Sequence, residues 1–467
     1  MAPWRRLFSS RAEKVPEASS AADDLPPPPY SEYPTEQHRN HGISTSPSAR
    51  QTPKKTDVKS DSKVIGSGTA ALNTDNDQKC SPFYSAAAGG QLSNVKELAK
   101  DGANINAQGN DGATPLNAAA RYGHLEVVRF LLQRGADAEI TNNAGWTPVN
   151  SAADANHLDV VKLLIQHGVD IHKPNNRGFT PLISAASQGH TNVVSLLLAN
   201  VAKVEDRTAK NATPLMLAAY QGNVDTVKLL LAAGSVINES NDKGITALNW
   251  AAGRGKGEVV RMLLAAGAKV DKPNNSGWTP LNSAADENHV EVAQALLAAG
   301  ASIDRINERG WTPLHSAVAR AHVDVVRVLL DHGAQVDLQN SGGWSPLNSA
   351  ADKGHVEVVR LLLEAGAMVN KCNNDGWTPL NSAANRNYVD VMRVLIKHGA
   401  DINMQNSEGW TPLNSAVDKG HIEAVRVLVG KGANIQITNS SGARPLKVAE
   451  RRGYTNIAKL LYDSAYE

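Results

Sequence analysis

The sequence has few aromatic residues, few cysteines and no excess of charge of one sign. Only 4% of its 467 residues are aromatic, which is low for one large globular core. Its two cysteines, Cys80 and Cys372, cannot form a disulfide framework and favour a reducing, intracellular environment. The 47 Lys and Arg residues balance 46 Asp and Glu residues, so the charge does not predict nucleic-acid binding. No apolar run approaches the roughly 20 residues of a membrane helix, and we expect no membrane association.

A short arginine-containing segment opens the sequence. Residues 1–12 hold three arginines with apolar residues between them, and the first acid is Glu13. This composition is faintly typical of a mitochondrial presequence, but the segment is short and further acids follow it closely. We therefore expect no mitochondrial import and predict a cytoplasmic location, with the nucleus as the alternative.

The composition changes near residue 76. The first 76 residues contain nine of the 22 prolines but only nine Leu, Ile, Val or Phe residues. That apolar fraction lies below the roughly 20% typical of chains that bury a core. The sequence therefore predicts a disordered tail over residues 1–76 and a structured region over residues 77–467.

The structured region repeats itself every 33 residues. A proline marks each of twelve units except the sixth, where Ala247 takes its place. The remaining positions of this series are Pro82, Pro115, Pro148, Pro181, Pro214, Pro280, Pro313, Pro346, Pro379, Pro412 and Pro445. A fixed period of this length is typical of a solenoid, in which each unit buries its apolar face only against its neighbours.

Each unit is predicted to hold two helices. In the third unit, Thr147 provides a side-chain cap and Pro148 suits the first helical position. A short turn such as Gly354-His355 separates this helix from a second one with an apolar stripe. The second helix ends at a glycine such as Gly366, and turn residues then lead to the next unit. We number the units one to twelve in chain order.

These motifs resemble the ankyrin repeat family over residues 77–467. The resemblance rests on the period, Thr-Pro-Leu, the Ala-Ala pair, Gly-His, Val-Val-x-Leu-Leu and the closing Gly-Ala. It implies an all-α solenoid whose turns and first helices form a concave, protein-binding face, with the first and last units as caps. The residue after Thr-Pro-Leu departs from the family pattern, since it is Asn in seven units and His only at His315. Val201 and Asn211 also replace expected glycines.

The sequence gives no sign of catalytic or metal chemistry. Seven of the 14 histidines occupy one repeat position, and equivalent side chains in neighbouring units lie about 8–10 Å apart, too far to share an ion. The glycine-rich run at 253–257 lacks the spacing of a phosphate-binding loop. We therefore expect no metal, no cofactor and no enzymatic activity.

Tryptophan precedes the helix-capping residue in six units, five of them consecutive. Asn follows four residues later and Asp eight residues later in several of these units, which places both on one helix face. The resemblance implies that this face lines the concave surface, so we predict a partner-binding surface in units seven to eleven rather than in the irregular units five and six. The candidate residues are Trp146 in unit three and, in units seven to eleven, Trp278, Asn282, Asp286, Trp311, Trp344, Asn348, Asp352, Trp377, Asn381, Trp410, Asn414 and Asp418. A second interpretation is that Trp covers gaps between units and Asn bonds back to the cap, and the two can hold together.

The tail carries one further motif. Pro27, Pro28 and Tyr30 belong to a Pro-Pro-x-Tyr pattern that resembles ligands of WW domains, which occur in ubiquitin ligases of the HECT class. Consecutive prolines favour the polyproline II helix, so ordering them on a partner costs little entropy. A Pro-rich spacer is the alternative. Thr52, followed by Pro53, resembles a proline-directed kinase site.

Taken together, these features predict a monomeric, non-enzymatic scaffold that binds other proteins through its repeats. The alternative function is an adaptor, in which Tyr30 recruits a WW-domain ubiquitin ligase and the repeats hold its substrate.

Overall fold

A computed structural model describes residues 81–465 of the chain. The predicted tail (residues 1–76), the WW-ligand motif at Pro27, Pro28 and Tyr30, and Thr52 all lie outside the described residues.

Residues 81–465 form 24 α-helices, two in each of the twelve units, and no strand. This confirms the all-α fold predicted from the repeat. The helices are α1 (Pro82–Ala88), α2 (Leu92–Lys100), α3 (Pro115–Arg121), α4 (Leu125–Gln133), α5 (Pro148–Asp154), α6 (Leu158–Gln166), α7 (Pro181–Gln188), α8 (Thr191–Ala199), α9 (Pro214–Gln221), α10 (Val224–Ala232), α11 (Ala247–Gly253), α12 (Gly257–Ala265), α13 (Pro280–Asp286), α14 (Val290–Ala298), α15 (Pro313–Ala319), α16 (Val323–Asp331), α17 (Pro346–Lys353), α18 (Val356–Glu364), α19 (Pro379–Asn385), α20 (Val389–Lys397), α21 (Pro412–Asp418), α22 (Ile422–Gly430), α23 (Pro445–Arg452) and α24 (Thr455–Asp463).

The first helix of each unit is short and capped at its start. In α5, the Thr147 hydroxyl accepts a hydrogen bond from the Asn150 backbone N–H at 3.2 Å, and Pro148 occupies the first turn. Proline has no N–H to leave unpaired there, and its fixed φ suits a helix. A residue in the left-handed conformation then reverses the chain, for example Gly354 at φ 76°. The capping residue and the glycine thus set the length of the helix.

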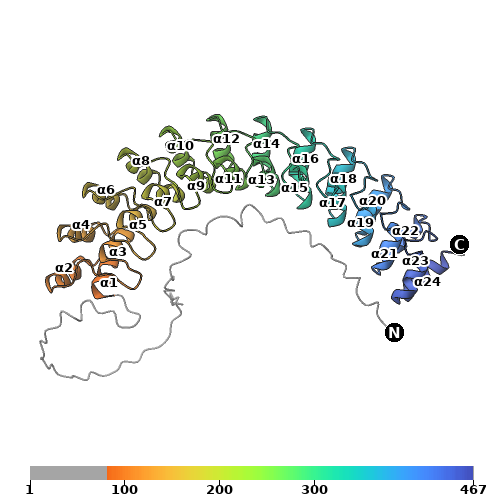
Figure 1. Cartoon of the computed structure of the whole chain (residues 1–467), viewed down its shortest axis with the longest axis horizontal. Coiled ribbons are helices and arrows are strands. Elements are labelled where there is room, and N and C mark those ends of the chain that lie inside the picture. Colours follow the sequence, from red (N-terminus) through yellow and green to blue (C-terminus); the bar gives the residue numbers. More distant parts are fainter. Residues whose placement is uncertain (1–80, 466–467) are drawn as a thin grey trace, which may run out of the picture.

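The helices form two layers of a crescent. Odd-numbered helices line the inner side and even-numbered helices the outer side (Figure 1). Each odd-numbered helix packs against the odd-numbered helices on either side of it, as α13 does against α11 and α15. The apolar stripe of each outer helix, such as Val358, Val359 and Leu362 in α18, faces inward and is buried. One continuous core therefore runs through the array.

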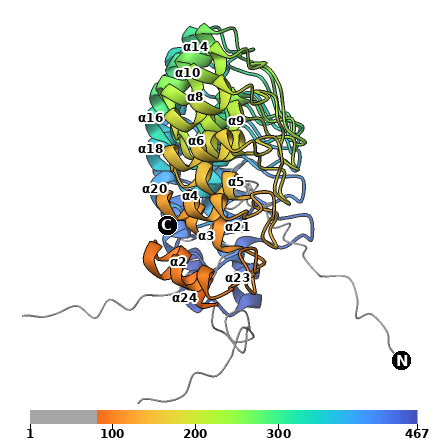
Figure 2. The same ribbon diagram turned by 90° about the vertical axis from the view of Figure 1, so that its left-hand side faces the viewer.

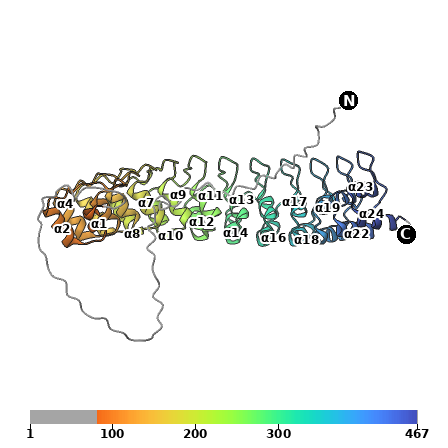
Figure 3. The same ribbon diagram turned by 90° about the horizontal axis from the view of Figure 1, so that it is seen from below.

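The loops between units all project to the same side of the two helix layers (Figures 2 and 3). Asn142 shapes one such loop, because its Oδ1 atom accepts hydrogen bonds from the backbone N–H groups of Ala144 and Trp146. The next residue, Asn143, donates its backbone N–H to the Asp111 carbonyl of the preceding loop at 2.8 Å. Backbone bonds of this kind recur from loop to loop and align them in a row.

Two of the predicted irregular positions keep the regular backbone. Val201 and Asn211 stand where the pattern has glycine, and their φ angles are 66° and 58°. The left-handed conformation is unfavourable for a β-branched residue, so Val201 is held there by the units on either side of it. Its side chain is exposed. The repeat geometry therefore overrides a poor local sequence at this junction.

Candidate partner-binding surface

The asparagines of the predicted surface are buried. Asn282, Asn348, Asn381 and Asn414 have no exposed side-chain area. In α17, Asn348 Oδ1 accepts hydrogen bonds from the backbone N–H and the hydroxyl of Ser345, at 3.2 and 2.8 Å. Its Nδ2 group donates to the carbonyl of Trp377 in the next unit at 3.1 Å. The expectation that these asparagines contact a partner is therefore corrected: their hydrogen-bonding groups are turned inward.

The same bond joins successive units along the array. The side-chain amide of Asn117, Asn249, Asn282, Asn348 and Asn381 donates to the carbonyl of a tryptophan one unit further on, Trp146, Trp278, Trp311, Trp377 and Trp410 respectively. The predicted asparagine and tryptophan series do meet, but across the boundary between units and through the tryptophan backbone. The tryptophan side chain takes no part in this bond.

Five tryptophan side chains are left half-buried at the bases of the loops. We call them the tryptophan column: Trp278, Trp311, Trp344, Trp377 and Trp410. Within residues 81–465 none of their indole N–H groups donates a hydrogen bond, and none is among the buried unpaired groups. Each of these N–H groups therefore keeps some solvent-accessible area. Trp146, in unit three, is buried and stands apart from the column.

The predicted aspartates form ion pairs with the following unit. Asp286 Oδ2 lies 2.8 Å from Arg320 Nη2. Asp352 pairs with Arg386 at 3.2 Å and Asp418 with Arg452 at 2.6 Å. These three pairs join unit seven with unit eight, unit nine with unit ten, and unit eleven with unit twelve. The ion pairs of the inner helices therefore recur every two units.

Burial of the carboxyl differs along this series. Asp286 is 3% exposed, whereas Asp352 and Asp418 are half-buried. Burial raises the pKa of Asp286 above its ordinary value, and the neighbouring Arg320 opposes that change. The aspartates therefore present paired charge to the inner surface, not free carboxylates.

The histidine series binds helix ends of the preceding unit. His157 Nε2 lies 2.9 Å from the Arg121 carbonyl, and His322 Nε2 lies 2.8 Å from the Asp286 carbonyl. A carbonyl at a helix end lacks a partner within its helix, and the imidazole N–H supplies one. Partial burial lowers the pKa of His157, His289 and His355, although the bond to the carbonyl acts in the opposite direction. Among the described residues no group of His, Cys, Asp and Glu is arranged to hold a metal ion.

His315 replaces asparagine in unit eight and makes the same set of bonds. Its Nδ1 atom accepts from the backbone N–H of Thr312 at 3.3 Å and faces the Thr312 hydroxyl at 2.9 Å. Its Nε2–H therefore donates to the Trp344 carbonyl at 3.0 Å. The ring is 1% exposed, and this burial lowers the pKa of His315 to about 4. Protonation of Nδ1 would remove the acceptor for Thr312.

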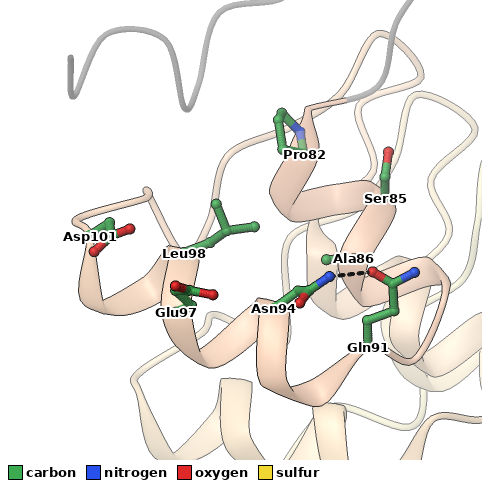
Figure 4. Close-up of a pocket in the computed structure, with 8 residues that line it drawn as sticks. All are labelled: Pro82, Ser85, Ala86, Gln91, Asn94, Glu97, Leu98 and Asp101. Carbon is green, nitrogen blue, oxygen red and sulfur yellow. Dashed lines mark hydrogen bonds between the residues drawn. The ribbon is translucent and has the colours of Figure 1, made fainter. Parts of the chain in front are cut away.

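The amino-terminal end of the array has an open pocket of about 330 Å³. Figure 4 shows it between α1 and α2, where Asn94 donates a hydrogen bond to Gln91 at 2.7 Å. Its lining holds the carboxylates of Glu97 and Asp101 and the hydroxyl of Ser85, and it contains no histidine or cysteine. Within residues 81–465, no helix is long and apolar enough to cross a membrane.

Comparison with known proteins identifies the family. A model of ankyrin repeats, built from three copies, matches overlapping stretches that run from residue 64 to residue 467. The chain therefore belongs to the ankyrin repeat family, whose repeats are generally protein–protein interaction modules. No curated protein matches the sequence.

The first prediction concerns the asparagine bond between units. Asn348→Ala removes the acceptor for the buried Ser345 N–H and one donor to Trp377, so we expect a loss of about 2 to 3 kcal/mol in unfolding free energy. Asn348→His should lose much less, because His315 makes the equivalent bonds in unit eight. Urea unfolding and hydrogen exchange at residues 373–377 measure both effects. Equal losses in the two variants would contradict the assignment.

The second prediction concerns pH. Because the pKa of His315 is about 4 in the folded state and about 6.5 when unfolded, the folded state binds fewer protons. Its contribution to stability is present above pH 6.5 and is lost as the pH falls from 6.5 towards 4, by up to about 3 kcal/mol. Between pH 7 and pH 4.5, the His315→Asn variant should therefore lose less unfolding free energy than the unsubstituted chain. Urea unfolding at each pH measures this loss. The other histidines are common to both proteins, so identical pH profiles would contradict the assignment to His315.

Proposed function

We propose that the chain is a non-enzymatic scaffold that binds an extended partner along the tryptophan column. The observation that supports this is the row of five half-buried tryptophans whose indole N–H groups have no acceptor in residues 81–465. Tryptophan combines a large apolar surface with one hydrogen-bond donor, which is why it often dominates binding energy in interfaces.

The spacing of the column favours a long, regular partner. Neighbouring units are about 8–10 Å apart, so five units make a strip roughly 40 Å long. An extended peptide of about 12 residues covers that length. It would present a backbone carbonyl to each indole N–H at regular intervals, and a repetitive partner meets the same surroundings in every unit. The buried asparagines, and His315 at Trp344, contribute by holding each tryptophan backbone of the column in place.

The alternative function is an adaptor for a WW-domain ubiquitin ligase. It is supported by Pro27, Pro28 and Tyr30 in the sequence, where a Pro-Pro-x-Tyr motif precedes an array that binds a substrate. In this alternative the tail recruits the ligase and the tryptophan column holds the protein to be modified.

The third prediction tests the tryptophan column. A partner isolated with the full chain should bind the Trp344→Ala/Trp377→Ala variant more weakly, by more than the ~2 kcal/mol typical of one hot-spot residue. The matched control is Arg327→Ala/Arg360→Ala, which changes exposed residues of the outer helices α16 and α18. Isothermal titration gives the affinities, and thermal melting gives the folded fraction. If the tryptophan variant melts much lower while its folded fraction binds normally, the column is structural only.

The fourth prediction tests the adaptor function. A peptide covering residues 23–34 should bind WW domains weakly, and Tyr30→Ala should abolish that binding, because the tyrosine completes the motif. Fluorescence anisotropy with a panel of WW domains measures it. The adaptor function loses its basis if the unsubstituted peptide binds none of them.

A further inference from the structure

The inner face of the array changes character at units five and six. In most other units the inner helix carries a serine at its fourth position, and the odd-numbered units three, seven, nine and eleven carry an aspartate at its seventh. Here α9 has Leu217 and Tyr220 at these positions, and α11 has Trp250 at the fourth. The Tyr220 and Trp250 rings meet edge to face with their centroids 5.6 Å apart. An aromatic cluster thus replaces the polar pattern at the middle of the concave side.

Arg254 also belongs to this cluster, and no carboxylate is paired with it. Arg254 follows α11, and its guanidinium lies 4.6 Å from the centroid of the Tyr220 ring. In units eight, ten and twelve the equivalent arginines pair with an aspartate, and Tyr220 stands where that aspartate would be. Within residues 81–465 Arg254 makes no ion pair, and its side chain is exposed. The cluster therefore offers an unneutralised cation beside aromatic rings.

Trp250 provides a second, independent observation. Its side chain is 5% exposed, and its indole N–H is buried with no hydrogen-bond acceptor among the described residues. Buried polar groups in folded proteins nearly always have a partner. Trp250 therefore supports the half-buried Tyr220 ring from within the array, through the edge-to-face contact, and leaves Tyr220 and Arg254 as the accessible part of the cluster.

The chain itself contains a segment with the complementary chemistry. Residues 23–34 read Asp-Asp-Leu-Pro-Pro-Pro-Pro-Tyr-Ser-Glu-Tyr-Pro, with three acids around four consecutive prolines. Proline-rich segments bind to aromatic side chains and present regularly spaced carbonyls. The acids Asp23, Asp24 and Glu32 complement Arg254 in charge.

The connecting chain is long enough for this contact. About 45 residues separate Pro34 from Ser81, where the described structure begins, and they can span up to ~150 Å. Units five and six lie about 45 Å along the array from the first unit. A tethered segment also binds at an effective concentration near the millimolar range, so a weak contact suffices.

We propose that residues 23–34 dock on the cluster of Tyr220, Trp250 and Arg254 and thereby withhold Tyr30 from other proteins. The docked prolines lie against the half-buried Tyr220 ring, which Trp250 supports from beneath, and the acids face Arg254. The docking itself is independent of the proposed function, and only its consequence, control over access to the WW-ligand motif, rests on the adaptor alternative.

The fifth prediction tests the docking in trans. The protein that receives the peptide is the full chain with Pro27→Ala, Pro28→Ala and Tyr30→Ala. These substitutions remove the chain's own motif, which would otherwise compete with the peptide. A fluorescein-labelled peptide of residues 20–36 should bind it saturably, with a Kd on the order of 100 μM. Adding Tyr220→Asp should weaken binding at least tenfold, because it removes one ring and neutralises Arg254. This substitution reproduces the Asp–Arg pair of units seven to twelve, so the fold should survive, as circular dichroism and thermal melting will show.

Two further variants make the result specific. Arg254→Ala, at an exposed position, should also weaken peptide binding at least threefold. Arg386→Ala breaks an ordinary Asp–Arg pair at the equivalent place in unit ten and should leave peptide binding unchanged. The proposal would be overturned if the peptide shows no saturable binding at millimolar concentrations of the chain. It would also be overturned if Tyr220→Asp and Arg254→Ala leave peptide binding intact.

A second measurement separates docking from the adaptor function. A WW domain that binds the isolated peptide should bind the full chain at least threefold more weakly, and Tyr220→Asp in the full chain should restore the affinity of the peptide. Equal affinity for peptide and full chain would contradict the withholding of Tyr30. The peptide assay contains no WW domain, so a failure to find any WW partner defeats the adaptor alternative and leaves the docking result standing.

Discussion

The array depends on one constraint: in units two, three and six to eleven, a buried polar side chain of the inner helix must find its partner in the next unit. Asn348 shows how this works, because it closes the start of α17 and also bonds to the Trp377 carbonyl. Neither bond is replaceable by water, since the asparagine is fully buried. A change in the 33-residue spacing would separate the amide from its carbonyl, so this bond favours a constant period in the units that make it. Histidines add a second link of the same kind at the opposite end of the inner helix.

This constraint separates the side chains that hold the array from those free to bind. At each residue of the tryptophan column, the backbone carbonyl is used between units while the indole remains half-buried with its N–H unpaired. The scaffold can therefore keep its geometry when the indole is exchanged, as unit four shows, where Phe179 occupies the same position and its N–H and carbonyl make the same loop bonds to Asn175. Function can vary at such a position without loss of the fold.

The sequence predicted the helix pairs because their signals are local. The capping Thr147, Pro148 and the glycine at a helix end act within one unit, and they repeat. The burial of Asn282 could not be predicted in the same way. Helical spacing places Asn and Asp on one face of the helix, but it does not show which of these residues the next unit covers. The cluster of Tyr220, Trp250 and Arg254 was also missed, although its signal was present. In units five and six, aromatic residues replace aspartate (Tyr220) and serine (Trp250) at two repeat positions. The irregular loops of these units instead favoured a binding surface elsewhere.

The ion pairs show that two units, and not one, form the chemical repeat of the inner face. Asp286, Asp352 and Asp418 belong to odd-numbered units and their arginines to even-numbered units, and Asp154 and Gln188 make the corresponding hydrogen bond between units three and four at 3.3 Å. The partly exposed pairs of Asp352 and Asp418 contribute at most about 1 kcal/mol each, so stability alone does not require this alternation there. Its larger effect is on the surface, because each pair fixes an arginine at intervals of about 20 Å along the concave side. Tyr220 and Arg254 continue the series with a ring in place of the carboxylate. Among the described units that carry an arginine at this position, unit six alone has no carboxylate paired with it, and there the inner face can attract an acidic segment.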